Sequence, residues 1–353
     1  MRTLVLALFA LCLGLPVQAQ APSATISGRV IDVETLEPLP GVNVFLDQTL
    51  LGAATDPQGR FEIKLIPLGS YSVVASALGF ETTDMEVDAF VADTVYTVDL
   101  RMRAQVVDMA GVEVEGERSP EWWADYERFQ DLFLGVTRRA KHAEIENPHV
   151  LSFNTEDGIF TAEAREPIRV RNEGLGYRVI FTLDIFHLDM NTDLLAMNGP
   201  FFFQELEPQN RREARRWRRN QRDVYEGSLA HVMATLVGGD LWNEPFQLFY
   251  DGRQDAPHAT RPGRRISVAG HFTVSPAEQP YMHYISFPDY FRVVHDATKA
   301  WIKIDGPEAL VHASGHIYAP RYSKSNVQVF GTLAARGVAD LLPRYYGWAP
   351  DVP

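Results

Sequence analysis

Residues 211–237, RREARRWRRNQRDVYEGSLAHVMATLV, carry the strongest helical pattern in a chain whose other patterns are mostly those of strands. Apolar side chains recur there at helical spacing, and seven arginines crowd the remaining positions of the first half. The apolar set is Trp217, Val224, Leu229, Val232 and Leu236. The spacing predicts one long helix that packs along one side and presents a cationic face on the other.

Strand patterns lie on both sides of this helix. Before it, 177–186 is apolar on both alternating sets of positions, which predicts one central strand covered on both faces. A shorter helix is expected from Pro120, with Ser119 as its cap and an aromatic stripe along it. The stripe is Trp122, Tyr126, Phe129 and Phe133. Strands, one long Arg-rich helix and strands again predict an α+β domain over 120–353.

Nearer the N-terminus, short runs rich in Val, Ile, Tyr, Phe and Thr follow one another between 24 and 102. Gly, Pro and Asp turns separate them, and no helical pattern intervenes. One turn is Asp56-Pro57-Gln58-Gly59, in which Pro57 presets its own φ and Gly59 accepts a positive one. This arrangement predicts an antiparallel β-sandwich, and the chain as a whole is expected to be mostly β.

The order SGRVIDVETLEPLPGVNVFL, TDPQGRFEI and YSVVASALGF resembles the carboxypeptidase regulatory-like domain, a transthyretin-like family. The resemblance covers about 24–102 and implies a seven-stranded antiparallel sandwich that serves as a folding or interaction module. Despite the family's name, it implies no catalysis.

The remaining sequence is similar to the C-terminal part of uncharacterised secreted bacterial proteins that carry this domain in front. Within the long helix, six positions match that group, while Gln221, Val224 and Val232 depart from it. The matching residues are Trp217, Asn220, Tyr225, Gly227, Ser228 and His231. No established reaction comes with this resemblance, so their role is left open.

The first 21 residues have the pattern of a secretory signal: Arg2, the apolar run LVLALFALCLGL, and a small-residue ending at Ala19-Gln20-Ala21. The single cysteine, Cys12, lies inside this segment, and the run is too short to span a bilayer. The expected organisation is a signal (1–21), a sandwich (22–104), a linker (105–119) and the α+β domain (120–353). The expected location is the periplasm or the outer membrane.

The charge balance, 33 Lys and Arg against 46 Asp and Glu, gives a net charge of −13 and argues against nucleic acid as a partner. No glycine-rich nucleotide loop occurs, so no cofactor is expected. No histidine has the glutamate spacing of a zinc carboxypeptidase. The pair His312 and His316, expected on one strand face, is a weak metal candidate, and Ser228 is interpreted as a small packing residue. No metal or catalytic residue is assigned.

The arginines of the long helix form the candidate binding face: Arg211, Arg212, Arg215, Arg218, Arg219 and Arg222. Like charges four residues apart destabilise a helix, partly offset by the expected pairs Arg219–Asp223 and Arg222–Glu226. The face is therefore expected to be solvated, to dock onto the acidic sandwich, or to contact an envelope protein or an anionic envelope component.

Three function classes remain open. The favoured interpretation is a non-catalytic secreted or cell-envelope protein that acts as a binding or assembly module. A glycan or peptidoglycan hydrolase would need a deep pocket that gathers His231 with carboxylates. A carbohydrate-binding protein would show exposed Trp or Tyr side chains on the sandwich, which has no tryptophan and only two tyrosines, Tyr71 and Tyr96.

Overall fold

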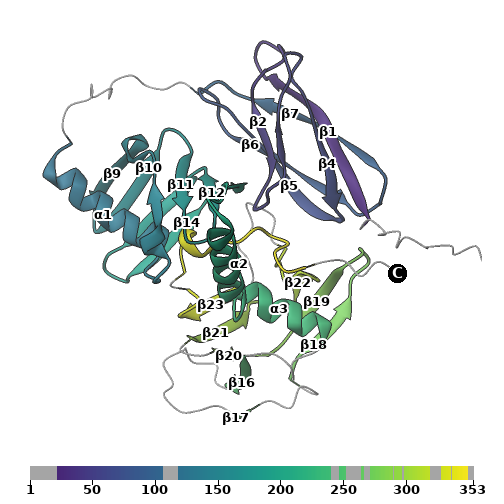
Figure 1. Ribbon diagram of the computed structural model, residues 1–353, viewed down its shortest axis with the longest axis vertical. Helices are drawn as coiled ribbons and strands as arrows, with labels where there is room; N and C mark the ends of the chain where they lie inside the picture. The colour runs from purple at the N-terminus through teal and green to yellow at the C-terminus, as the bar shows by residue number, and fades with distance from the viewer. Residues whose placement is uncertain are drawn as a thin grey trace, which may run out of the picture.

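The computed structural model describes residues 22–105, 118–239, 246–251, 264–265, 271–288, 290–295, 298–318, 327–334 and 336–348. The expected signal segment, its Cys12 and most of the expected linker lie outside these residues. The described residues are mainly strands, which confirms the mostly β expectation (Figure 1). None of the described helices is long and apolar enough to cross a lipid bilayer.

The N-terminal unit is a sandwich of two sheets, ordered β4-β1-β7 and β3-β2-β5-β6. Its strands are β1 (Ser23–Asp32), β2 (Asn43–Leu46), β3 (Gly52–Ala54), β4 (Arg60–Pro67), β5 (Gly69–Ser76), β6 (Thr83–Ala89) and β7 (Val95–Met102). Strand β4 buries Phe61 and Ile63 and exposes Glu62 between them, as a half-buried strand should. The expected turn is present, because Gly59 has a φ of 71° and the Asp56 carboxylate accepts from the Gln58 N–H at 2.9 Å.

The expectation of an entirely antiparallel sandwich is wrong at one pair of strands. Strands β1 and β7 run parallel, with Gly28 opposite Val98. A Cβ at position 28 would lie 1.7 Å from the Val98 carbonyl oxygen, so only glycine fits this close approach.

The middle unit packs one helix against two four-stranded sheets, ordered β14-β13-β10-β9 and β15-β12-β11-β8. Its elements are α1 (Pro120–Leu134), η2 (Ala140–His142), β8 (Ala143–Ile145), η3 (Pro148–Val150), β9 (Leu151–Glu156), β10 (Ile159–Ala164), β11 (Ile168–Asn172), β12 (Tyr177–Phe181), β13 (Ile185–Asp189), β14 (Leu194–Asn198) and β15 (Phe201–Glu205). The α1 stripe is buried as expected: Phe129 and Phe133 are both 0% exposed. The expected single strand over 177–186 is instead two, β12 and β13, which belong to different sheets.

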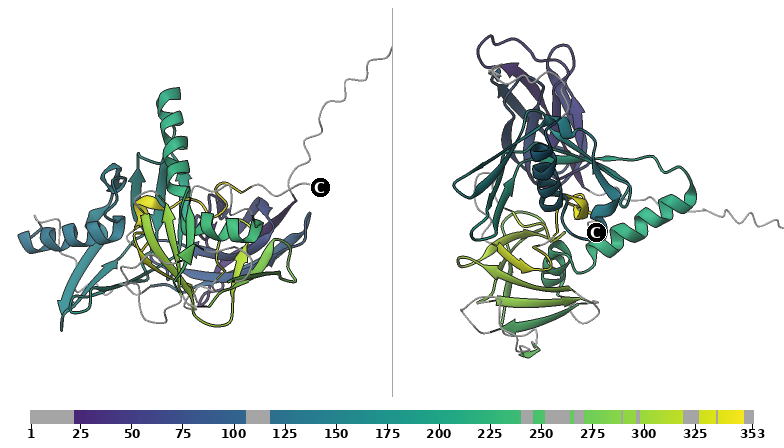
Figure 2. Two further views of the ribbon diagram at one scale, coloured as in Figure 1. Left: turned by 90° about the horizontal axis from the view of Figure 1, so that it is seen from below. Right: turned by 90° about the vertical axis from the view of Figure 1, so that its left-hand side faces the viewer.

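The Arg-rich stretch contains two helices rather than the expected one. They are α2 (Arg211–Tyr225) and α3 (Leu229–Gly238). Gly227 between them has a φ of 70°, which ends the first helix, and the Ser228 side chain accepts from the His231 N–H at 3.1 Å to cap the second. In Figure 2, α2 projects from the body of the molecule while α3 lies against it.

The C-terminal unit has its own apolar core, formed by α3 and two further sheets, β17-β16-β20-β21-β23 and β18-β19-β22. Its strands are β16 (Gln247–Asp251), β17 (Arg264–Arg265), β18 (Thr273–Pro276), β19 (Met282–Ser286), β20 (Tyr290–His295), β21 (Thr298–Ile304), β22 (Ala309–His312) and β23 (Val327–Gly331), and η4 (Val338–Asp340) follows. The region expected as one domain over 120–353 therefore holds two separate hydrophobic cores.

The sandwich docks on the middle unit through β15. The Gln48 N–H donates to the Phe201 carbonyl at 2.7 Å, and the Phe45 and Phe202 rings lie 4.5 Å apart. Residues 343–348, here called the C-terminal strap, tie the sandwich to the C-terminal unit.

The strap makes this connection with aromatic side chains. The Tyr345 ring lies 6.0 Å from Tyr71 of the sandwich and 5.2 Å from His312 of β22. Trp348 lies 4.7 Å from the same histidine. Edge-on aromatic contacts of this kind stabilise by about 0.5–1.5 kcal/mol each beyond the area they bury.

Candidate functional site

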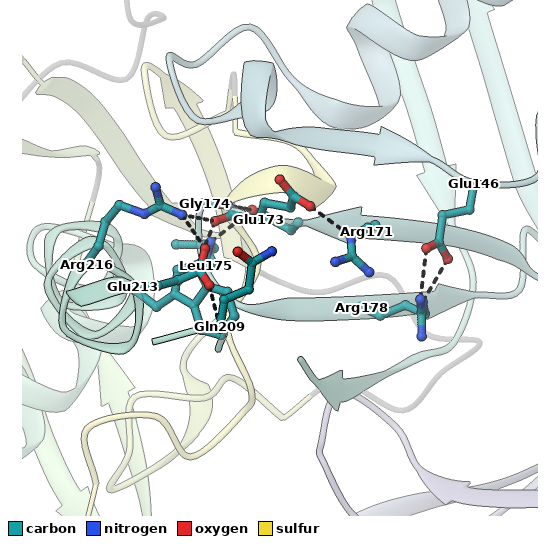
Figure 3. A network of polar contacts seen from close by, with 11 residues as sticks. Glu146, Arg171, Glu173, Gly174, Leu175, Arg178, Gln209, Glu213 and Arg216 are labelled. Carbon is teal, nitrogen blue, oxygen red and sulfur yellow. Dashed lines mark hydrogen bonds and ion pairs between the residues drawn. The ribbon is translucent and has the colours of Figure 1, made fainter. Parts of the chain in front are cut away.

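One side of α2 is fastened to the turn that joins β11 and β12. The Trp217 indole N–H donates to the Glu173 carbonyl at 2.7 Å. One turn further along, the side-chain amides of Asn220 and Gln221 donate to the next two carbonyls, those of Gly174 (2.8 Å) and Leu175 (2.7 Å). Three successive backbone acceptors are thus satisfied by one face of a helix, which fixes its position on the middle unit. Figure 3 labels the three residues that provide these acceptors, beside α2.

The turn itself is held from within. The buried Asn172 side chain accepts from the N–H groups of Gly174 and Leu175, both at 3.0 Å, and donates to the Ala339 carbonyl at 2.9 Å. Gly176 has a φ of 77°, and a Cβ there would lie 2.3 Å from the Trp217 ring. Glycine at this position therefore allows both the backbone conformation and the close packing of the indole.

The opposite side of α2 carries the arginines. All six residues of the candidate binding face are exposed: Arg211, Arg212, Arg215, Arg218, Arg219 and Arg222. The seventh arginine of α2, Arg216, is not among these six. Its Nη2 lies 2.9 Å from Glu213 Oε1, and it is the α2 arginine that forms an ion pair within the described part of the chain. The expected pairs Arg219–Asp223 and Arg222–Glu226 are not among the ion pairs of the described residues, and Glu226 lies just beyond the end of α2 as its cap residue.

Four arginines line a shallow groove on this face together with Asn210 and Glu213. They are Arg212, Arg215, Arg216 and Arg219, which at about 100° per residue fall within an arc of roughly 100°. Asn210 caps the helix by accepting from the Glu213 N–H at 3.0 Å, and the Glu213 carboxylate in turn accepts from the Gln209 N–H at 2.8 Å. The charge of that carboxylate offsets part of the positive charge at the first turn. The rest of the groove remains cationic.

The other residues of the matched motif form the joint between α2 and α3. His231 is 8% exposed, and its Nδ1 accepts from the Gly227 N–H at 3.0 Å. Its ring packs against Tyr225 at 4.7 Å, and a Cβ on Gly227 would lie 2.7 Å from the His295 ring. Ser228, expected as a small packing residue, is instead the cap of α3. These four residues build a helix junction, while Trp217 and Asn220 anchor α2.

A cavity of about 590 Å³ lies where the sandwich, the middle unit, α3 and the C-terminal strap meet. The carboxylate in its lining is that of Asp340, and His231 does not line it. The pocket that would favour a hydrolase, with His231 among several carboxylates, is thus not found in the described residues. Nor do these residues contain a cluster of three or more groups able to hold a metal ion.

The histidine pair expected on one strand face lies elsewhere. His312 ends β22, and a tight turn follows in which its N–H donates to the His316 carbonyl at 2.8 Å. Gly315 in this turn, with a φ of 84°, approaches α3 so closely that a Cβ would lie 1.7 Å from the Ala230 carbonyl oxygen. The pair therefore serves the packing of the strap and α3.

The sandwich offers no exposed aromatic platform within its described residues. Tyr71 is 1% exposed, and Tyr96 is half-buried, with its hydroxyl accepting from the Val91 N–H at 3.0 Å. The described residues of the sandwich therefore lack the exposed aromatic side chains that would favour carbohydrate binding. Docking of the arginine face onto the acidic sandwich is not seen either, since the sandwich docks through β15 and the strap.

Sequence reasoning missed the Glu173–Leu175 acceptors and the charged residues around the cavity, Arg336, Asp340 and Arg344. Nothing in the local sequence marks these residues, because their hydrogen-bond partners are far away in the chain. Glu173 is 44 residues from Trp217, and Arg336 is 112 residues from Val224. Gln221 departs from the matched motif in sequence, yet its side-chain amide donates to a backbone carbonyl just as that of Asn220 does. An amide at that position was the one available signal.

Comparison with known proteins identifies the sandwich. Residues 26–114 match the family model described as the CarboxypepD_reg-like domain, and the match ends inside the expected linker. No curated protein matches the chain.

Among solved structures, the chain is similar to a cohesin–X-dockerin complex from Acetivibrio cellulolyticus, at 26% identity and a TM-score of 0.20 over 23% of this chain. It thus spans 58% of that chain's length. It is also similar to a dioxygenase domain from Streptomyces sp. SirexAA-E (18% identity, TM-score 0.19, 26% of this chain and 86% of that one). A third is the 5-hydroxyisourate hydrolase of Klebsiella pneumoniae (23% identity, TM-score 0.16, 23% and 93%).

Proposed function

We propose, from the premise that the N-terminal sandwich is a CarboxypepD_reg-like domain, that the chain is a non-catalytic binding or assembly module of the bacterial envelope. Its contact surface would be the arginine face of α2. The signal-like segment 1–21 supports export across the inner membrane and residence in the periplasm or at the outer membrane.

The observation that carries this proposal is the contrast between the two sides of α2. One side is fixed by three side-chain hydrogen bonds to the β11–β12 turn. The other presents exposed guanidinium groups on a helix that projects from the body (Figure 2). Because the helix is held in place, its backbone loses little conformational entropy on binding, and the planar guanidinium fork of each arginine matches carboxylate and phosphate groups.

The test removes charge from this face and compares it with equal charge removed elsewhere. Arg212, Arg215 and Arg219 are changed together to Gln, and the control variant changes the exposed sandwich residues Arg60, Arg101 and Arg103 to Gln. Binding of the tagged protein to gently solubilised Gram-negative envelope, and to vesicles with and without phosphatidylglycerol, is measured at low and high salt.

We expect the α2 variant to bind about tenfold more weakly than the control, because three exposed ion pairs at about 0.5 kcal/mol each add up to about 1.5 kcal/mol. Loss confined to the vesicles would identify an anionic lipid as the partner, and loss of a co-purified protein would identify a protein. Equal binding by the two variants would rule out the arginine face as the contact surface.

A further inference from the structure

A cleft runs between the sandwich and the middle unit. It consists of two cavities, of about 460 and 500 Å³, that share three lining residues, Asn43, Phe202 and Gln204. Each volume is that of a small-molecule site, so the two in succession have room for a longer ligand. The Phe45 and Phe202 rings, 4.5 Å apart, give the first cavity an apolar wall.

The polar side chains where the two cavities meet are free to bind a ligand. Asn43 and Gln204 are both exposed, and within the described residues neither side-chain amide takes part in an intramolecular hydrogen bond. A primary amide can donate and accept at the same time, as a peptide group does. The centre of the cleft therefore suits a ligand that offers both donors and acceptors.

One boundary of the cleft is strand β3, whose backbone is paired on one side only. Just after β3, the Thr55 N–H donates to the Val42 carbonyl at 3.0 Å. Because the direction of backbone hydrogen bonds alternates along a strand, Ala53 also faces β2, while Gly52 and Ala54 direct their N–H and C=O groups away from it. No described strand pairs with that side of β3. It also carries no lysine, proline or bulge, the features that often keep an edge from pairing.

Strand β15, which also lines the cleft, is an edge strand that the sandwich covers in part. The Gln48 N–H donates to the Phe201 carbonyl at 2.7 Å, and the Phe203 N–H donates to the Thr49 carbonyl at 2.9 Å. Beyond these bonds, Glu205 lines the cleft, and by the same alternation its backbone groups point away from β12. The cleft thus continues an edge that already binds another segment through its main chain.

The charges along the cleft favour a cationic ligand. Carboxylates outnumber guanidinium groups among the lining residues, which include Glu81, Glu166, Asp184 and Glu205 against Arg165 and Arg169. A ligand with positive charge complements this excess. Leu50, which is 41% exposed, adds an apolar contact beside Phe202.

We propose that this cleft binds an extended peptide segment of a partner protein, with apolar residues at alternate positions and a net positive charge. Its backbone would pair with the free edge of β3, and its alternate side chains would lie against Leu50 and Phe202. A glycan could use the amides and the ring, but it has no backbone that pairs with a strand. This inference does not depend on the arginine face of α2.

The first experiment selects ligands for the full chain from a phage library of random 12-residue peptides, and calorimetry then measures the selected peptides in synthetic form. We expect alternating apolar peptides with lysine or arginine, one bound per chain, with a Kd below about 100 μM. A selection without any peptide of Kd below about 1 mM would overturn the proposal. So would binding in the cleft by cellohexaose, xylohexaose or chitohexaose when no peptide binds there.

Amide hydrogen exchange, followed by NMR, tests the pairing directly. With peptide bound, exchange should slow at least about tenfold at Gly52 and Ala54, because their N–H groups gain acceptors. Ala53 between them, which already faces β2, is the internal control and should change little. A peptide that binds without slowing exchange at Gly52 and Ala54 would contradict strand pairing.

Variants then place the site. Ala54→Pro removes an N–H that points away from β2, so the β2 pairing is kept and peptide affinity should fall at least about fivefold. Ala54→Ser retains the N–H and should bind normally. Gln204→Trp obstructs the junction of the two cavities and should weaken binding more than about tenfold even if Ala54→Pro folds poorly. Unchanged affinity in both Ala54→Pro and Gln204→Trp would show that the peptide binds elsewhere.

Discussion

Trp217→Ala should lower the free energy of unfolding by about 3–5 kcal/mol, the usual cost of truncating a large buried aromatic side chain. The indole is 7% exposed, donates to the Glu173 carbonyl at 2.7 Å and covers Gly176. Urea denaturation measures the loss, and hydrogen exchange should show that protection falls first in α2. Arg212→Ala, on the exposed face of the same helix, is the matched control and should change stability by less than about 0.5 kcal/mol.

Two further variants separate the ring from its hydrogen bond. Trp217→Phe keeps most of the packing and should cost only about 1 kcal/mol, because the Glu173 carbonyl keeps a second donor, Arg216 Nη2 at 3.5 Å. Gly176→Ala should be severely destabilising alone, because its Cβ would lie 2.3 Å from the indole. Combined with Trp217→Ala it should add less than its single cost, since the clash is gone and only the strain of a positive φ remains. A loss below 0.5 kcal/mol in Trp217→Ala would contradict the anchoring role of this side chain.

The sequence predicted those parts of the fold that depend on local patterns. Alternation in β4 and the Asp56–Gly59 turn predicted the sandwich, and aromatic spacing predicted α1. The break between α2 and α3 was also visible: Gly227 is a typical helix end, and Ser228 followed by an apolar run is a typical start. The apolar residues from Trp217 to Leu236 nevertheless keep helical spacing across the break, so the pattern predicts one continuous helix.

Other features depend on distant parts of the chain and leave no local signal. The strand expected over 177–186 divides at Thr182, whose carbonyl oxygen lies 1.8 Å from where a Cβ on Gly199 would be. No glycine or proline marks that division in the strand itself. The exposed arginines could be predicted from helical spacing, whereas the carbonyls that hold the other side of α2 could not, because backbone acceptors look alike in sequence.

The cluster that joins the strap to the sandwich should be sensitive to acid. His312 is 0% exposed, and burial, assisted by the charge of Arg344, lowers the pKa of its side chain from 6.5 to about 3. Its Nδ1 accepts from the Ser314 N–H at 3.0 Å, so the neutral ring carries its proton on Nε2. Protonation would remove this acceptor and place a second cation beside Arg344.

The sign of the pH effect follows from which state binds the proton. Between pH 6.5 and about 3, the unfolded chain binds a proton at His312 that the folded protein does not. The stabilisation is therefore fully present above pH 6.5 and is lost progressively as the pH falls. The loss is at most about 1.4 kcal/mol per pH unit, on the order of 5 kcal/mol in total.

Urea denaturation would measure this dependence in the unmodified protein and in His312→Gln. The pH values of about 7.5, 6, 5 and 4 extend from above the usual pKa of about 6.5 to well below it. Most other titrating groups act alike in both proteins, so the difference between the two slopes reports His312 together with its effect on His316, whose pKa it helps to lower. We expect the variant to be less stable at pH 7.5 but to lose less stability on acidification. Parallel slopes would mean that His312 takes up its proton equally in both states. Because Trp348 lies 4.7 Å from the His312 ring, its fluorescence should change before global unfolding, as the strap is the first contact that a charged imidazole would disturb.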